Sequence, residues 1–235
     1  MRIFPDIHQV DGITCNVFVI VEPDGLTVID AGMPGAAPRI LAAIAALGRQ
    51  PREVRRVLLS HQHVDHIGGL AALVAATGAE TWAHPRDTPA IEGRGPREAP
   101  HGLLGLVFRA ALFPRLRPVT ITHAAVAGDV IPALSGEGGL QVIDTPGHTM
   151  GHISFYSPGR KLLFAGDAVR ESGGRIKPPP AMLSFDMPLA LQSARTLAAM
   201  EVEACLPGHG AAIAAGAGAR FAIPVEADAA RAGVR

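Results

Sequence analysis

Cysteine is scarce in this sequence, and neither sign of charge is in excess. The two cysteines, Cys15 and Cys205, lie far apart and do not form the closely spaced pairs of a disulfide framework or a thiolate metal site, so we expect two free buried thiols. The 21 basic side chains equal the 21 acidic ones in number. A nucleic-acid surface needs clustered Lys and Arg, and the one cluster here (Arg109, Arg115 and Arg117) is interpreted as a solvated helix face. We therefore expect no nucleic-acid partner.

Long apolar segments are also missing. No uninterrupted run of 18 apolar residues occurs, and the N-terminus lacks a charged region followed by an apolar one. We therefore expect no signal peptide, no membrane association and a cytoplasmic location. Nevertheless, 48% of the 235 residues are hydrophobic, which is enough to bury a full core.

Short apolar runs alternate with helical patterns along the chain. Each half reads as a run of strands followed by a helix, which favours an α/β or α+β protein with two stacked sheets and outer helices. We expect one domain over residues 1–210 and a partly disordered Ala/Gly-rich tail over 211–235. The predicted strands cover 14–21, 26–32, 54–60, 81–84, 119–126, 140–145, 153–157, 161–167 and 204–210, and the predicted helices 36–48, 66–76 and 188–200.

The stretch SHQHVDHIGG (60–69) places three histidines and an aspartate within six positions. If the preceding strand continues through it, His61, His63 and Asp65 point to the same side. His66 breaks this alternation and can join them only if the chain turns, which Gly68-Gly69 permits with Asp65 as helix N-cap. The four side chains would then converge on one point.

Three later turns carry the same kind of side chain directly after an apolar run. They are DTPGHTMGH (144–152), FAGDAV (164–169) and LPGHG (206–210), and they add His148, Asp167 and His209. Seven nitrogen and oxygen ligands are too many for one tetrahedral zinc, but they suit two metal ions that share one carboxylate and a bridging water. The alternative, in which these histidines only cap turns, is less favoured.

The motifs HQHVDH, TPGHTMGH, FAGDA and LPGHG, in this order, resemble those of the metallo-β-lactamase-fold hydrolase superfamily. The resemblance runs from about Ile3 to His209 and implies an α+β fold, a four-layer αββα sandwich with metals at one edge of the two sheets. True β-lactamases typically carry Cys or Ser where this chain has Asp167, so the chain looks more like the glyoxalase II and lactonase branch. By motif, the first metal would be held by His61, His63 and His148, the second by Asp65, His66 and His209, and both by Asp167.

This resemblance implies a dinuclear metal-dependent hydrolase whose metal-bridging hydroxide cleaves a small ester, lactone or thioester. The histidine-rich set favours two Zn²⁺ ions, although Fe and Mn also accept such ligands. Asp65 is the candidate catalytic residue, because its second oxygen can orient the bridging water and move its proton. The alternative is a mononuclear iron enzyme of the persulfide dioxygenase type, which uses positions of the His61, His148 and Asp167 kind.

Other residues are candidates for supporting roles. Asp30 is expected either to orient a ligand histidine or to cap a turn, and Ser60 and Thr149 either to support ligands or to bond the local backbone. His152 is expected to be structural. The apolar segment 102–118 is a lid inserted over a small-molecule substrate, a contact between copies in a homo-oligomer, or a helix packed on the core.

Overall fold

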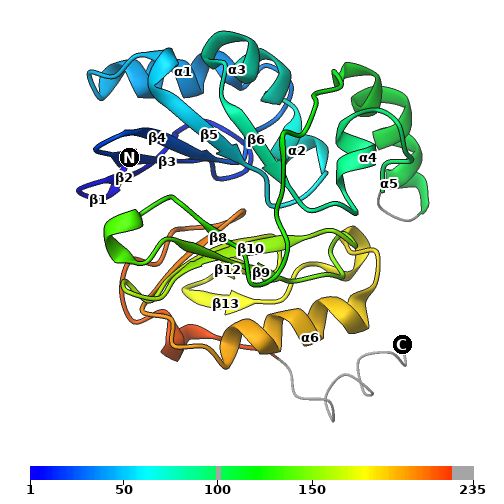
Figure 1. The fold of residues 1–235 in the computed structure, drawn as a ribbon. Coiled ribbons are helices and arrows are strands. Elements are labelled where there is room, and N and C mark those ends of the chain that lie inside the picture. Colours follow the sequence, from blue (N-terminus) through cyan, green and yellow to red (C-terminus); the bar gives the residue numbers. More distant parts are fainter. Residues whose placement is uncertain (99–101, 224–235) are drawn as a thin grey trace.

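The computed structural model describes residues 1–98 and 102–223, and these form two facing sheets with helices outside them (Figure 1). In the described part, the N-terminal half forms a seven-stranded sheet in the order β1 to β7. The first four strands form an antiparallel meander, and β4 to β7 run parallel. Its strands are β1 (Arg2–Phe4), β2 (Ile7–Gln9), β3 (Phe18–Glu22), β4 (Gly25–Ile29), β5 (Val54–Leu58), β6 (Glu80–Ala83) and β7 (His123–Ala124).

The second sheet has five described strands, in the order β14-β11-β10-β9-β8. Only β11 and β14 are parallel, and the helix α6 (Met187–Ala198) lies between them in sequence. Asp186 caps this helix by accepting a hydrogen bond from the Leu189 amide at 3.0 Å. The strands are β8 (Val130–Ile131), β9 (Leu140–Asp144), β10 (Ile153–Ser157), β11 (Leu162–Gly166) and β14 (Ala204–Pro207), with a separate hairpin of β12 (Arg170–Ser172) and β13 (Arg175–Lys177).

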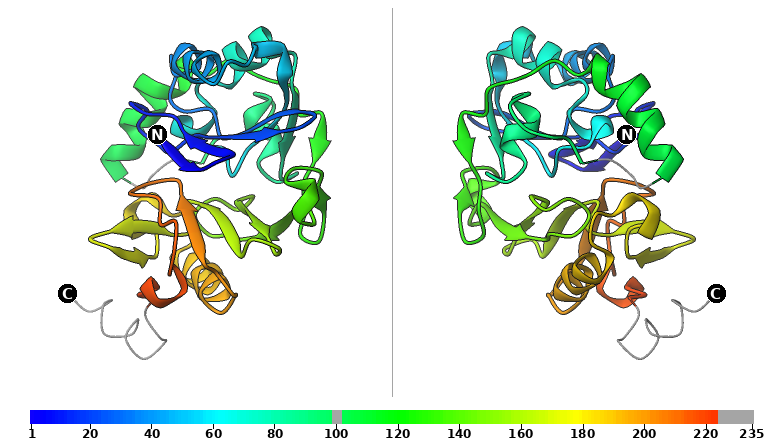
Figure 2. Two further views of the ribbon diagram at one scale, coloured as in Figure 1. Left: turned by 90° about the vertical axis from the view of Figure 1, so that its left-hand side faces the viewer. Right: turned by 90° about the vertical axis from the view of Figure 1, so that its right-hand side faces the viewer.

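Three apolar layers hold the four structural layers together. The helices α1 (Ala37–Ala46) and α3 (Leu70–Thr77) pack Ile40 and Leu73 against the outer face of the first sheet. Between the sheets, the Phe18 and Phe164 rings meet edge to face at 5.6 Å. On the far side, Leu197 of α6 packs against the second sheet, and the side views show the same sequence of layers (Figure 2). The predicted αββα sandwich is therefore confirmed.

Some element boundaries differ from the prediction. The helix expected over 66–76 is divided into α2 (Val64–Ile67) and α3, because Gly68 and Gly69 press against Pro34 and the Ala31 carbonyl, where a side chain would clash. His63 precedes the first turn of α2, so Asp65 lies inside that turn and is not the N-cap.

The strand expected over 119–126 is reduced to the two residues of β7. Ahead of it, hydrogen bonds that involve threonine hydroxyls link Thr81 with Thr120 and Thr122, and they replace part of a regular ladder. Between β6 and β7 the described chain forms α4 (Thr88–Ile91), α5 (Gly102–Val107) and a π-helical turn at Phe108–Leu112.

The chain beyond 210 belongs to the domain for at least a further 13 residues. Ile213 pairs with Cys205 through two backbone hydrogen bonds, and Phe221 bridges to Ile176 of β13. The boundary expected after 210 therefore falls too early, because apolar residues of this segment cover the second sheet next to α6. The rest of the expected tail, 224–235, lies outside the described residues.

Two expectations from composition can be compared with the structure. Cys15 and Cys205 are both free and buried, as predicted. Within residues 1–98 and 102–223, no helix combines the length and the apolar character that a membrane crossing requires.

Candidate metal centre

The seven predicted ligand side chains lie close together. They come from segments that follow strands of both sheets, and one of these segments is the short helix α2 (Figure 1). The chain turns sharply after each of these strands, so the side chains come from tight loops on a rigid support. His61 and His63 follow β5, Asp65 and His66 lie in α2, His148 lies between β9 and β10, Asp167 follows β11, and His209 follows β14.

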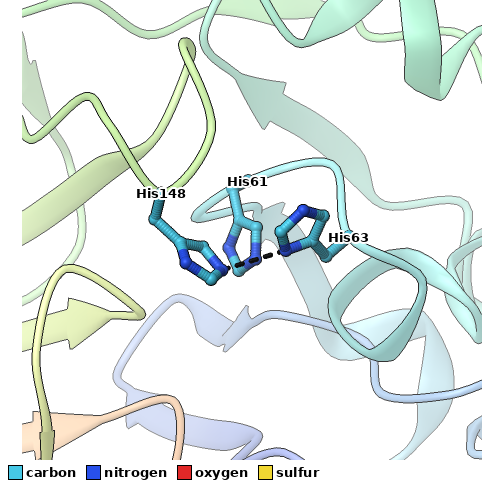
Figure 3. Close-up of side chains that lie close together, drawn as sticks. All are labelled: His61, His63 and His148. Carbon is cyan, nitrogen blue, oxygen red and sulfur yellow. Dashed lines mark hydrogen bonds between the residues drawn. The ribbon is translucent and has the colours of Figure 1, made fainter. Parts of the chain in front are cut away.

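His61, His63 and His148 form a first group whose rings point toward one another (Figure 3). His63 Nδ1 lies 2.9 Å from His148 Nε2, and the His61 ring stands edge-on to the other two at 4.7 and 4.8 Å. Burial, followed by the neighbouring histidines, lowers the pKa of His61 well below its ordinary value and that of His63 to about 3. These two rings are therefore neutral at pH 7, the state in which imidazole binds a metal.

Asp65, His66 and His209 form a second group, and Asp167 lies between the two groups. His209 Nε2 is 3.1 Å from Asp65 Oδ2. Asp167 Oδ2 lies 3.3 Å from Nε2 of both His148 and His209, while its Oδ1 lies 3.4 Å from His66 Nε2. Asp167 thus contacts a member of each group.

Oppositely charged side chains are a feature of the second group more than of the first. Burial opposes the charged forms, but the acidic groups of Cys15, Asp167 and Asp30 raise the pKa of His66 well above its ordinary value. The pKa of His209 rises to about 9, because its hydrogen bonds to Asp167 and Asp65 outweigh burial. For Asp65, burial is outweighed by His66 and His209, which lower its pKa to about 2. Protonated imidazoles and carboxylates therefore face each other here.

The residues present fit a metal ion. His61 Nε2, His66 Nε2 and Asp167 Oδ1 are buried and have no hydrogen-bond partner within the part of the chain that the structure describes. Such atoms are normally satisfied, because leaving them unpaired costs free energy. Imidazole nitrogens and carboxylate oxygens are the donors that zinc and related divalent ions accept, so a bound cation would satisfy these atoms.

Asp30 and Ser60 hold two of the histidine rings. Asp30 has a positive φ of 61°, and its Oδ2 lies 2.8 Å from His66 Nδ1. The Ser60 amide and hydroxyl donate to the same carboxylate, and the hydroxyl lies 3.0 Å from His61 Nδ1. Both histidines are therefore held through Nδ1, which leaves Nε2 free for a ligand.

His152 supports Asp167 from behind. Its Nε2 accepts a hydrogen bond from the Asp167 amide at 2.9 Å, and its Nδ1 lies 2.7 Å from the Thr145 hydroxyl. Burial lowers the pKa of His152 well below its ordinary value, so the ring is neutral and can accept. Gly208 also matters here, because a Cβ at that position would collide with Asp167 Oδ1. The expectation that His152 is structural agrees with these contacts.

Asp87 is a residue of this site that sequence reasoning missed. Its buried carboxylate accepts hydrogen bonds from the Gln62 amide (2.8 Å), the Gln62 side chain (3.1 Å), the Thr149 hydroxyl (2.8 Å) and the Gly151 amide (3.0 Å). It thereby joins the loop of His61 and His63 to the loop of His148. Thr149, which follows His148 in the chain, uses its side chain on Asp87. In the sequence Asp87 looks like an ordinary residue ahead of a helix, and only the fold brings its partners close.

Replacing Asp87 with Ala should lower the free energy of unfolding by about 3 kcal/mol, because four buried donors would lose their acceptor. Urea unfolding followed by circular dichroism measures the change. Asp24, whose side chain is mostly exposed, is a matched control, and Asp24→Ala should cost less than about 1 kcal/mol. Equal losses in the two variants would show that Asp87 does not hold the two loops together.

A cavity of about 220 Å³ opens directly onto the second group. The carboxylates of Asp65 and Asp167 and the ring of His209 are part of its lining. The rest of the lining comes from β12 and the segment that follows β13, through Arg170, Pro179, Pro180 and Leu183. A small molecule in this cavity would therefore meet the candidate metal centre from the side of Asp65.

Comparison with known proteins identifies the family. The model of the metallo-β-lactamase superfamily matches residues 10–209, so this chain belongs to that superfamily. The chain is 32% identical to a probable metallo-hydrolase, YflN, from Bacillus subtilis strain 168, over 87% of this chain and 83% of that protein. It is also 32% identical to a hydroxyacylglutathione hydrolase from Jannaschia sp. strain CCS1, over 68% of this chain but only 50% of that protein.

The solved structures lead to the same family. A mutant of a metallo-β-lactamase from Cronobacter sakazakii is 28% identical, with a TM-score of 0.69 over 89% of this chain and 79% of that one. The Rm3 metallo-β-lactamase is 26% identical, with a TM-score of 0.68 over 89% and 77%. The chain is accordingly a metal-dependent hydrolase of this superfamily, and these comparisons give no support to the iron oxygenase alternative.

Proposed function

We propose that the protein is a dinuclear hydrolase of small esters, lactones or thioesters. The observation that carries the proposal is the position of Asp167, whose carboxylate lies within 3.4 Å of histidines from both groups. One ion would be held by His61, His63 and His148 and the other by Asp65, His66 and His209, with Asp167 between them. Zinc is favoured, because five of the seven donors are imidazoles.

Divalent ions held by these residues would lower the pKa of a bound water molecule and would polarise a carbonyl group. The chain itself contributes Asp65, which is ionised at neutral pH because its pKa is about 2. Its side chain is 21% exposed and lines the 220 Å³ cavity, so it can orient a water molecule by accepting a hydrogen bond from it. Asp30, Ser60 and His152 keep the ligand side chains in place during the reaction.

The relatives support an ester or thioester substrate. The Jannaschia relative is named as a hydrolase of hydroxyacylglutathione, and YflN as a probable metallo-hydrolase. Asp167 stands where true β-lactamases typically carry Cys or Ser, which favours the glyoxalase II and lactonase branch over antibiotic hydrolysis. Small molecules, and neither nucleic acid nor membrane, are the partners proposed for the site.

Turnover of a substrate panel tests the proposal. The zinc-loaded protein should hydrolyse at least one class among short aryl esters, γ- and δ-lactones and acyl thioesters, and removing the metal with a chelator should abolish the activity. A β-lactam in the same panel should remain intact. Hydrolysis of the β-lactam alone would contradict the assignment to the ester and thioester branch.

Metal binding should release protons unequally from the two groups. His66 and His209 are protonated at pH 7 in the metal-free protein, because their pKa values are raised, so binding at the second group must displace about two protons. His61 and His63, with lowered pKa values, are already neutral. Affinity for the second ion should therefore increase as the pH rises toward about 9.

Calorimetric titrations in buffers of different ionisation enthalpy measure these protons. One equivalent of metal should bind with little proton release, and the other should release about two protons. In His209→Asn the second value should fall by about one. Equal proton release for both equivalents would contradict the charge distribution that we describe for the two groups.

A further inference from the structure

A larger cavity, of about 660 Å³, lies beside the loops that carry the first group of the candidate metal centre. Its described lining comes from α4, α5, the residues Pro96 to Glu98, and Phe185. The helices α4 and α5 stand beside α2 in Figure 1. Gln62, which lies between His61 and His63, forms part of the wall, and the Phe185 amide donates to the His148 carbonyl at 3.1 Å. A ligand here would therefore lie next to the loops that carry the first group.

Arginine is the charged side chain that recurs around this cavity. Arg86, Arg97 and Arg109 all line it, and within residues 1–98 and 102–223 none of the three forms an ion pair with an acidic group. The Arg97 Nε atom is buried without a hydrogen-bond partner in that part of the chain, and burial lowers the pKa of its guanidinium. A buried N–H group without a partner costs free energy, and a bound anion would satisfy it. The rest of the guanidinium is half-exposed and lies over the Phe113 ring, 6.0 Å from its centroid.

Acidic side chains near the cavity do not balance these charges. Glu98 lines the wall, but burial and then the nearby Asp87 raise its pKa to about 7, so that a substantial fraction is neutral at physiological pH. Its carboxylate already faces the Met150 amide at 3.3 Å. Asp87 is buried and uses both oxygens on the two ligand loops. The cavity therefore presents net positive charge.

The remaining wall is apolar. Leu106 of α5 and Phe185 are large side chains that are 62% and 52% exposed, and both line the cavity together with Pro89, Ala90 and Pro96. The segment 102–118 is thus divided in its packing. Leu112, Phe113 and Leu116 pack against the apolar layer between the first sheet and the helices α1 and α3. In contrast, Leu103, Leu106 and Val107 are exposed. A ligand that covered the exposed part would need an apolar body as well as an anionic end.

We propose that this cavity binds one half of the substrate, an apolar chain that ends in an anionic group such as a carboxylate. This inference rests on the proposed hydrolase function, since it places the cleaved carbonyl at the candidate metal centre next door. Arg97, together with Arg86 and Arg109, recognises the anion, and Leu106 and Phe185 cover the chain. The acyl half and the leaving half are the two sources from which the anion can come.

Binding of hexanoate and of its neutral analogue hexanamide tests the cavity without turnover. Calorimetry on the full-length metal-loaded protein should show hexanoate binding at least about tenfold tighter, because one charge-assisted hydrogen bond to arginine accounts for that much. Arg97→Gln should remove most of this preference. The double variant Arg86→Gln/Arg109→Gln, which changes two exposed side chains, should weaken it as well. Arg117→Gln, an exposed arginine outside the cavity, is the matched control and should keep it.

Each variant must carry the same metal content as the parent protein, so that any carboxylate bound at the metal cancels in the comparison. A preference that survives in both arginine variants would place the anion elsewhere and overturn the proposal. So would equal binding of hexanoate and hexanamide by the parent protein.

Turnover then identifies the half that carries the anion. The substrates are pairs of esters. In each pair one ester bears a terminal carboxylate and the other bears the corresponding amide, and the group is placed either in the acyl half or in the leaving half. Arg97→Gln should lower kcat/KM about tenfold, mainly through KM, for the substrates that carry the carboxylate in one of the two halves. For the amides the loss should be less than about twofold. An equal loss on all substrates would contradict anion recognition. If no substrate is hydrolysed, the proposed function fails, while the hexanoate titration still decides the present inference.

Discussion

Asp167→Ala is expected to reduce the metal content by at least one ion per chain and to lower turnover by about three orders of magnitude or more. The reason is that Asp167 contacts His148 of the first group and His66 and His209 of the second. Loss of a supporting hydrogen bond to a ligand typically reduces affinity 10- to 100-fold, and loss of a carboxylate between two ions should exceed that. Elemental analysis and a turnover assay on the same preparation measure both effects.

Asp144→Ala is the matched control for that variant. Asp144 ends β9 on the same sheet, and its side chain is 44% exposed. It should keep the parent metal content and activity. Full metal occupancy with retained activity in Asp167→Ala would refute a role for this carboxylate between the two ions.

Asp30→Asn is expected to weaken binding of the second ion about 10- to 100-fold and to leave the affinity for the first ion nearly unchanged. Asn tolerates the positive φ at this position, so the backbone should persist while the negative charge beside His66 Nδ1 is lost. An amide must also turn its NH₂ toward the ring or toward the two Ser60 donors, where it cannot accept a hydrogen bond.

Stepwise removal of metal by a chelator of known affinity measures this change. In Asp30→Asn one ion should leave at a lower chelator concentration than in the parent protein, and the other at the same one. Asp144→Asn is the control with the same chemical change outside the centre. An equal loss of affinity for both ions would indicate that Asp30 acts on the fold as a whole and not on His66.

The candidate ligands could be selected from the sequence because each comes soon after a buried apolar strand, in a turn or in the short helix α2. Local patterns of this kind, such as VRRVLLS before His61 and KLLFAGD at Asp167, determine both the strand and the place where it ends. The alternation favoured only an α/β or α+β protein with two stacked sheets, and the four-layer αββα sandwich was implied by the resemblance of the motifs. Asp30 was a candidate for a supporting role because it ends a buried strand close to a glycine, and Ser60 because it precedes the candidate ligand His61.

What could not be predicted depends on contacts between distant segments. Asp87 precedes a short helix in the sequence, and its four hydrogen bonds arise only when the loops after β5 and β9 are brought together. The break between α2 and α3 results from close packing of Gly68 and Gly69 on the segment after β4. The docking of 211–223 likewise depends on partners in β13 and β14, which an Ala/Gly-rich composition does not reveal.

Elemental analysis of the protein purified without added metal tests the central claim most directly. Two ions held by His61, His63, His148, Asp65, His66, His209 and Asp167 predict close to two zinc or manganese atoms per chain. The content should fall to one or fewer in Asp167→Ala. A content of one iron per chain in the parent protein, with no second ion taken up when zinc is supplied, would contradict the dinuclear hydrolase.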